Sequence, residues 1–159
     1  MTDTPARDIR CYVLVRNDLP SLNGGKATAH THHAGVQMVA KYFLDQSIVR
    51  EYIEQGIAIG ADHFNTTISL SANLGQIETV LKMADQMDYV ADQVLDPTYP
   101  FFVDEEDVAL IDPTKATTTP VRSDGRVLMT RPEITCAYVL GYAGDDVFRA
   151  LVGGLKLMP

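Results

Sequence analysis

Arg10-Cys11-Tyr12-Val13-Leu14-Val15-Arg16 is the stretch that decides the fold, because it is almost continuously apolar. Such a run, without alternating polar residues, predicts a central strand that is covered on both faces. The loop that follows, residues 17–25, is rich in Asn, Pro, Ser and Gly. A long helical pattern then begins near Lys26. Its recurrences at spacings of four and three predict one buried stripe, formed by Ala29, His33, Val36, Ala40 and Phe43.

The rest of the chain alternates between helix-like and strand-like segments. Helical patterns occupy residues 46–55, 74–87 and 144–152, and strand patterns occupy residues 66–71, 89–95 and 134–142. This alternation predicts a single α/β domain, residues 1–159, in which helices enclose a sheet. Residues 97–133, rich in Pro, Thr and Asp, fit the pattern least. We interpret them as an insertion that leaves the core, for which a β-hairpin is one possible form.

The composition is that of an ordinary globular protein. The chain has 159 residues, of which 46% are hydrophobic and 21% charged, enough for one stable core. No apolar run approaches the roughly 20 residues that a membrane-spanning helix needs, so we expect no membrane partner. Residues 1–10 lack the apolar segment of a secretory signal, which favours a cytoplasmic location. Cys11 and Cys136 lie in apolar runs, and we expect both to be buried, reduced thiols.

The charge is uneven along the chain. The formal net charge of −8 argues against strong, unspecific nucleic-acid binding, and we expect no DNA partner. Residues 83–113 contain nine acids and no Lys or Arg, whereas the rest of the chain holds 12 acids and 13 bases, a net of +1. A face outside the acidic segment is therefore free to meet an RNA, which the acidic segment would repel.

Three histidines, His30, His32 and His33, stand close together in the first helical pattern. On a helix His30 and His33 share a face, and His32 leaves it. Two imidazoles without a carboxylate or thiolate do not make a metal site, so we expect no metal. The stretch from Gly56 to Gly60 is too short and too poorly spaced for a dinucleotide-binding loop, so we expect no NAD and no other cofactor.

Two segments near the N-terminus are the most specific feature of the sequence. They read Val13-Leu14-Val15-Arg16-Asn17-Asp18-Leu19 and Gly25-Lys26-Ala27-Thr28-Ala29-His30-Thr31-His32-His33-Ala34. These segments resemble the strand ending in Arg-x-Asp-Leu, and the helix reading Gly-Lys-x-Ala-Ala-Gln-x-x-His-Ala, of the peptidyl-tRNA hydrolases of the second type. Residues 66–87 and 134–158 are similar to that family in position and pattern. The resemblance implies a three-layer sandwich with a mixed, mostly four-stranded sheet, and a homodimer.

The resemblance implies a metal-independent hydrolase in translation, which cleaves the ester between a peptidyl, or N-blocked aminoacyl, group and tRNA. His30 stands where the family has a Gln. The family's third strand is followed by a segment like Asp-Ala-Gly-Arg-Thr-Gln. Asp96 stands at the end of the third strand, where that Asp falls, and Asp124-Gly125-Arg126 is an alternative counterpart. Neither placement matches the family's Thr and Gln.

The candidate site residues follow from these positions. Gly25 and Lys26 combine loop amides, a helix N-terminus and an ammonium group, which together suit a phosphate or a developing oxyanion. Asp18, at the carboxyl end of a central strand, is placed to orient Lys26 or a water molecule. We expect Asp96, with Asp124 as the alternative, to act as the catalytic acid or base.

The remaining candidates come from the helix and the first strand. His30 replaces a side chain that only forms hydrogen bonds, and as an imidazole it can serve as a base near neutral pH. His33 matches the family's His and either contacts substrate or packs the helix. Arg16 matches the family's Arg and is assigned to substrate binding on that resemblance.

Two functions remain open at this stage. The first is the hydrolase just described, acting on peptidyl-tRNA. The second is a catalytically diverged binding or regulatory protein with the same fold. The acidic segment, the insertion and the unmatched Thr and Gln favour the second.

Overall fold

The computed structural model of the chain describes residues 8–19, 21–58 and 65–159. Six strands form one sheet in the order β3-β5-β1-β2-β6, with β4 paired to β5. The elements are β1 (Ile9–Arg16), α1 (Gly24–Tyr42), α2 (Ser47–Ala58), β2 (Thr66–Ala72), α3 (Leu74–Gln86), β3 (Val90–Asp104), the 3₁₀ helix η1 (Glu105–Leu110), β4 (Thr117–Ser123), β5 (Arg126–Tyr142), α4 (Asp146–Val152) and β6 (Lys156–Leu157).

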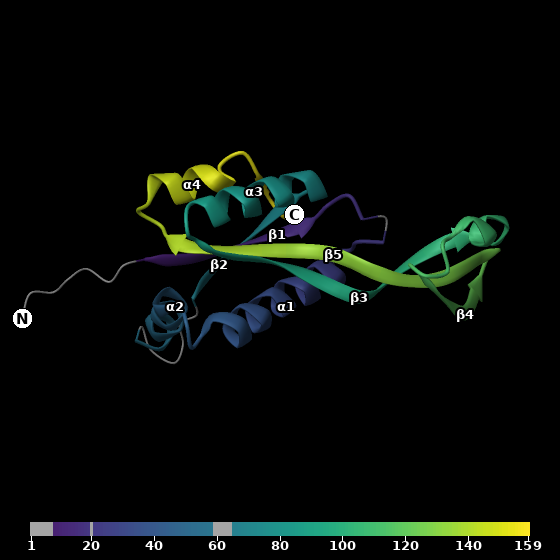
Figure 1. The fold of residues 1–159 in the computed structure, drawn as a ribbon, viewed down its shortest axis with the longest axis horizontal. Coiled ribbons are helices and arrows are strands. Elements are labelled where there is room, and N and C mark those ends of the chain that lie inside the picture. The colour runs from purple at the N-terminus through teal and green to yellow at the C-terminus, as the bar shows by residue number, and fades with distance from the viewer. Residues whose placement is uncertain (1–7, 20, 59–64) are drawn as a thin grey trace, which may run out of the picture.

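β1 is the centre of the sheet, as its apolar sequence predicts. It pairs with β2 in parallel and with β5 in antiparallel orientation. Seven of its eight residues are buried, because helices cover the sheet on both sides (Figure 1). The α/β class, the mixed sheet with four main strands and the helices on both faces are therefore confirmed.

Alternate residues of β1 feed two separate cores. Ile9, Cys11, Val13 and Val15 point toward α1 and α2, where they meet Met38 and Tyr52 among others. Tyr12 and Leu14 point toward α3 and α4, where they meet Ile77 and Phe148. Each strand residue thus packs against a helix, and this fixes the strand register. Cys11 and Cys136 are both free thiols in the interior.

The buried stripe predicted for α1 is wrong. The residues that α1 buries are Ala27, His30, Ala34 and Met38, whereas all five predicted residues are exposed. Both sets recur at helical spacing. The sequence does not distinguish the inner set from the outer one, because α1 carries almost no charged residue to mark its outer face. Contact with the sheet selects the first set and leaves the second in solvent.

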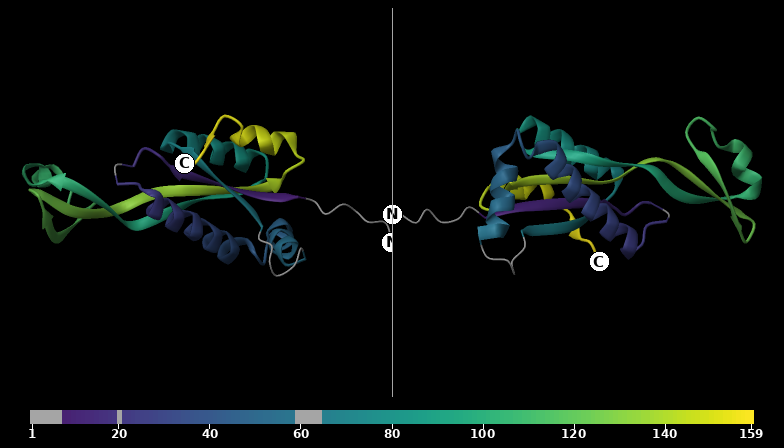
Figure 2. Two further views of the ribbon diagram at one scale, coloured as in Figure 1. Left: turned by 180° about the vertical axis from the view of Figure 1, so that it is seen from behind. Right: turned by 90° about the horizontal axis from the view of Figure 1, so that it is seen from below.

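Residues 97–133 form an arm that projects from the domain (Figure 2). The third strand, predicted to end at Leu95, continues to Asp104, and β5 accompanies it from Arg126. Two irregularities in the β3–β5 register, after Val94 and after Asp96, mark the point where the arm leaves the body. β-Bulges of this kind bend a strand and are common near functional sites.

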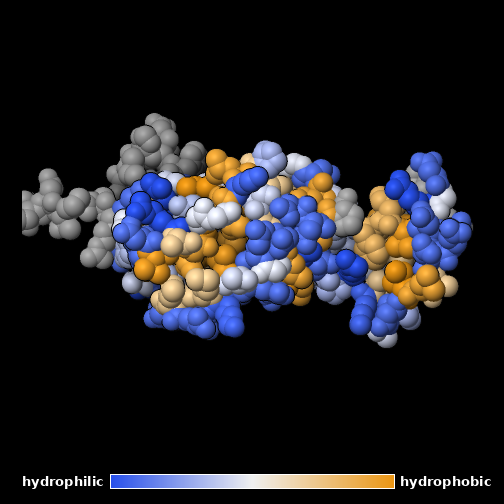
Figure 3. Space-filling model, turned by 90° about the horizontal axis from the view of Figure 1, so that it is seen from above, coloured by the Kyte–Doolittle hydropathy of each residue, from blue (hydrophilic) through white to orange (hydrophobic). Residues whose placement is uncertain are grey.

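The arm has its own small core. Val127, Met129 and Ala116 are buried there, with η1 packed against them. Other apolar residues stay on the surface, and Figure 3 shows them as a band on the arm beside hydrophilic side chains. None of the helices in the described part of the chain has the length and apolar character needed to cross a lipid bilayer.

Candidate functional site

Most of the candidate residues lie where β1 ends, where α1 and α3 begin, and where the arm leaves the body. In α/β sheets, loops at the carboxyl ends of parallel strands are the usual place for ligands. Asn23 caps α1 by accepting a hydrogen bond from the Lys26 amide, and Asn73 caps α3 through a reciprocal bond with Gln76. These caps fix the start of both helices beside the end of β1.

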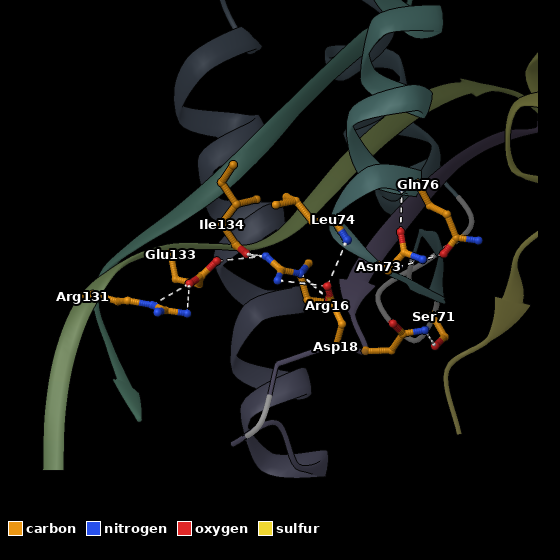
Figure 4. Close-up of polar contacts among 10 residues, drawn as sticks. Arg16, Asp18, Ser71, Asn73, Leu74, Gln76, Arg131, Glu133 and Ile134 are labelled. Carbon is orange, nitrogen blue, oxygen red and sulfur yellow. Dashed lines mark hydrogen bonds and ion pairs between the residues drawn. The ribbon is translucent and has the colours of Figure 1, made fainter. Parts of the chain in front are cut away.

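Arg16 is the centre of a buried ionic cluster (Figure 4). Its Nε lies 2.5 Å from one Asp18 carboxylate oxygen, and its Nη1 donates to Glu133 at 3.0 Å and to the Ile134 carbonyl at 2.8 Å. The Arg16 side chain is only 7% exposed. A guanidinium engaged in this way connects the root of the arm to the loop after β1.

Asp18 belongs to the same cluster. Partial burial alone would raise the pKa of Asp18. Hydrogen bonds from Arg16 and from the backbone amides of Asp18 and Leu74 outweigh burial, so the pKa lies below its ordinary value of 3.8. The Asp18 carboxylate therefore sits at the α3 N-terminus as a stable anion. Its observed partners are Arg16 and Leu74, not Lys26, for which the sequence proposed it as a support.

Lys26 lies on the other side of this loop, in the first turn of α1. Its Nζ is 2.9 Å from Ser21 Oγ and 5.0 Å from the centre of the Tyr99 ring. Gly25 precedes it with an exposed backbone, and a Cβ there would meet only the Asn23 side chain, at 3.4 Å. The first amides of α1 have no partner within the helix, so their positive dipoles and the ammonium group share one region.

Tyr99 and Ser21 are the site residues that sequence reasoning missed. Tyr99 comes from the arm root and is 1% exposed, although the segment around it is polar and proline-rich. Its hydroxyl lies 2.8 Å from Ser21 Oγ, which also contacts the Pro100 carbonyl at 2.8 Å. A tyrosine between two prolines was the available signal, but no periodicity indicates that it is buried.

His30 lies one turn further along α1 and is 4% exposed. Neither of its ring nitrogens has a hydrogen-bond partner among the described residues. The ring packs against Tyr99, with centroids 6.1 Å apart, and against His33 at 6.3 Å. Burial lowers the pKa of His30 below 6.5, the nearby Asp96 charge opposes this, and His33 and Lys26 reinforce it.

An unpaired imidazole in the interior lowers the stability of the fold, because a buried polar group without a partner loses its hydrogen bonds to water. Native structures tolerate such a group where a ligand or water uses it. A neutral imidazole has one donor and one acceptor, and in His30 neither has a partner among the described residues.

The two candidate aspartates have different positions. Asp96 lies at the arm root, where its carboxylate caps the Thr98 amide at 2.9 Å and acts electrostatically on His30. Asp124 forms, with Gly125, the two-residue turn between β4 and β5 at the far end of the arm. Both turn residues have positive φ, 52° and 74°, as a type I′ hairpin turn requires. The fold thus brings Asp96, and not Asp124, to the site.

The histidine cluster does not converge with acidic groups. His32 and His33 are exposed on α1, and no three His, Cys, Asp or Glu residues gather as metal ligands within the described ranges. The chemistry that the arrangement offers comes from Lys26, His30 and Asp96, supported by Tyr99 and Ser21. The Lys26 ammonium can bind an anion, and the neutral His30 imidazole can accept a proton.

Comparison with known proteins gives little further guidance. No family model and no curated protein matches the chain. Thirteen chains of solved structures match it. Among them is a protein of unknown function from Agrobacterium tumefaciens strain C58, 10% identical, with a TM-score of 0.48 and coverage of 96% of this chain and 98% of that chain. Function must therefore be argued from the site.

Proposed function

We propose that the chain hydrolyses the ester between a peptidyl, or N-blocked aminoacyl, group and tRNA, at the site of Lys26, His30 and Asp96. The observation that carries the proposal is the buried His30 imidazole without a protein partner, next to Tyr99 and one turn from Lys26. The resemblance of residues 13–34 to the peptidyl-tRNA hydrolases of the second type supplies the substrate class.

His30 acts as the general base. Burial lowers the pKa of His30, so the ring is neutral at pH 7 and can accept a proton from an attacking water molecule. The imidazolium that forms is then stabilised by the Asp96 carboxylate, whose charge already favours the protonated ring. The same proton passes to the departing ribose oxygen when the ester bond breaks.

Lys26 stabilises negative charge. An ester carbonyl placed before α1 develops an oxyanion during attack, and the Lys26 ammonium and the first α1 amides offer positive charge to it. Ser21 and Tyr99 hold the ammonium by a 2.9 Å hydrogen bond and by ring contact at 5.0 Å. Such preorganised charge is usually the largest single contribution to acyl transfer.

The ion pairs of Arg16 hold together the elements that carry the site residues. Arg16 joins Asp18 on the loop before α1 to Glu133 on β5, beside the strand that carries Tyr99 and Asp96. Because Lys26 and His30 come from α1 and the other two from the arm root, their spacing depends on this connection. The cluster therefore positions catalytic groups without contacting substrate.

A binding or regulatory protein is the second candidate, and the acidic arm favours it. Asp104, Glu105, Glu106 and Asp107 are exposed together around η1 and would repel an RNA backbone. In this second function the acidic arm binds a basic protein, and the site near Lys26 does not hydrolyse tRNA esters. Turnover of tRNA esters separates the two functions.

The experiment that tests the proposed base is the pH dependence of hydrolysis of an N-acetylated aminoacyl-tRNA. The wild-type rate should fall on the acid side below pH 6.5, since protonation of His30 removes the base. His30→Gln keeps a hydrogen-bonding side chain but cannot take the proton, so kcat should fall about 100-fold or more and lose that acid limb.

The matched control is His32→Gln, which changes an exposed histidine on the same helix and should keep the wild-type profile. An unchanged rate and acid limb in His30→Gln would remove His30 as the base. Absence of turnover in folded wild-type protein would remove the hydrolase altogether and leave the binding protein.

A further inference from the structure

Arg131, at the root of the arm, is held in place by two neighbours and is still open to solvent. Its Nε and Nη2 lie 2.9 Å from Oε2 of Glu133, and its guanidinium carbon lies 4.8 Å from the centre of the Phe101 ring. The other carboxylate oxygen of Glu133 accepts a hydrogen bond from Arg16, which ties Arg131 to the buried ion pairs of the domain (Figure 4). The Arg131 side chain is nevertheless 44% exposed. An arginine that its own fold has already ordered loses little conformational entropy when it binds an anion.

Arg131 lies next to the candidate site. In the register of β3 and β5 it is directly opposite Tyr99. Residues opposite each other in an antiparallel pair lie on the same face of the sheet, with Cβ atoms about 5 Å apart. The Tyr99 ring centre is 5.0 Å from Lys26 Nζ. Lys26 and Arg131, one from α1 and one from β5, are therefore both neighbours of Tyr99.

The acidic run of the arm begins far from Arg131. Its first residue, Asp104, is five residues beyond Tyr99 on β3, which is about 17 Å at 3.4 Å per residue. Exposed charges farther apart than about 8 Å are largely screened at physiological salt. The two acids nearer to Arg131 have partners of their own, because Asp96 accepts from the Thr98 amide and Glu133 pairs with two arginines. The root of the arm can therefore attract an anion that the outer part of the arm repels.

We infer that Arg131 binds a phosphate of the unpaired 3′ end of tRNA, beside the ester at Lys26. This inference rests on the proposed function, which supplies tRNA as the ligand. The ester joins the acyl group to the last ribose, so the phosphates next to that ribose lie close to the catalytic groups. Because Nε and Nη2 of Arg131 point to Glu133, its Nη1 group is left to donate to a second anion. Arginine suits this role, since its planar guanidinium pairs with phosphate oxygens through several N–H groups at once.

Arg126 offers a matched control on the same strand. It also lies over an aromatic ring, with its guanidinium carbon 5.2 Å from the centre of Phe102. In the register of β3 and β5 it is opposite Asp104, at the outer part of the arm. Loss of Arg126 therefore removes the same charge and the same kind of ring contact without changing the surroundings of Tyr99.

The test is the affinity of the full chain for deacylated tRNA, measured by fluorescence anisotropy over a series of salt concentrations. Two forms of the tRNA are compared, one intact and one from which the unpaired 3′ nucleotides have been removed. Arg131→Gln should raise the Kd for intact tRNA about 10-fold. It should also reduce the slope of log Kd against log salt by about 0.7, as expected for one phosphate of a single strand. Arg126→Gln should bind as the wild type does.

The trimmed tRNA locates the contact. Wild type and Arg131→Gln should bind it equally weakly, because the partner of Arg131 is then absent. Equal losses from Arg131→Gln and Arg126→Gln would indicate unspecific attraction and overturn the inference. Wild-type binding that does not depend on the 3′ nucleotides, or no binding of tRNA by folded wild type, would overturn it as well. These two measurements need no variant, so they decide the matter even if Arg131→Gln folds poorly.

Hydrolysis of N-acetylated aminoacyl-tRNA separates this inference from the proposed function. Arg131→Gln should raise KM and leave kcat nearly unchanged, because Lys26 and His30 remain in place. A folded wild type that releases no tRNA, but binds it through Arg131, would remove the hydrolase and keep the binding site. Turnover with the same KM and Kd in wild type and Arg131→Gln would keep the hydrolase and remove the binding site.

Discussion

Replacement of Arg16 by methionine tests the account of the arm root. The methionine keeps an apolar stem of similar length but removes the Arg16 donor from the Ile134 carbonyl and from the Glu133 carboxylate, which is 15% exposed and keeps only its ion pair with Arg131. Breaking a buried ion pair from one side costs about 3–5 kcal/mol. Asp18 is 39% exposed and recovers hydration, so we take the lower end, about 3 kcal/mol.

That loss is measurable. For a domain of this size, each kcal/mol shifts the melting temperature by about 2–4 °C, so Arg16→Met should melt about 6–12 °C below wild type. Urea unfolding followed by circular dichroism gives the free energy directly. Arg10→Met is the control, because Arg10 lies on the same strand and pairs with Asp8 in solvent, where a pair contributes about 0.5 kcal/mol or less. Equal effects of the two substitutions would refute the buried cluster.

Two further predictions concern stability. Asp18→Asn should be less stable than wild type at pH 6, and the difference should shrink as the pH falls below 3.8, because the lowered pKa of Asp18 stabilises the fold only while the carboxylate is ionised. Urea titrations across pH measure this, and a difference that does not shrink as the pH falls below 3.8 would contradict it. Gly141→Ala should cost about 1–3 kcal/mol, because its Cβ would lie 2.5 Å from the Phe148 ring, whereas Gly144→Ala, with nothing within 4 Å, should be nearly neutral in thermal melts.

Much of the fold could be predicted because the central strands have unambiguous patterns. The apolar run of β1 is a local signal of this kind. The side chains of Asn73 and Asp145 are also local features, because they accept hydrogen bonds from backbone amides at the starts of α3 and α4. α1 could not be resolved in the same way. Its sequence offers two stripes of equal quality, and only contact with the sheet decides which one is buried.

The site was predictable in part. Lys26, His30 and Asp96 were proposed from the sequence, and the structure places them near one another. Their contacts with Tyr99 and Ser21 were not foreseen, because Ser21 and Tyr99 lie 78 positions apart and meet only through the bend of β3. The partners of Asp18 and Arg16 were not foreseen: the sequence assigned Asp18 to Lys26 or a water molecule and Arg16 to substrate. Pattern alone showed that they end a strand, not that they would pair with each other and with Glu133.

The most direct test of the central claim is release of free tRNA from N-acetylated aminoacyl-tRNA by purified protein, with and without a chelator. The account predicts turnover that survives the chelator and is lost in Lys26→Ala, whose fold should be unchanged because Lys26 contributes little to the core. Wild-type activity in a folded Lys26→Ala protein, or no release of tRNA by folded wild type, would contradict it.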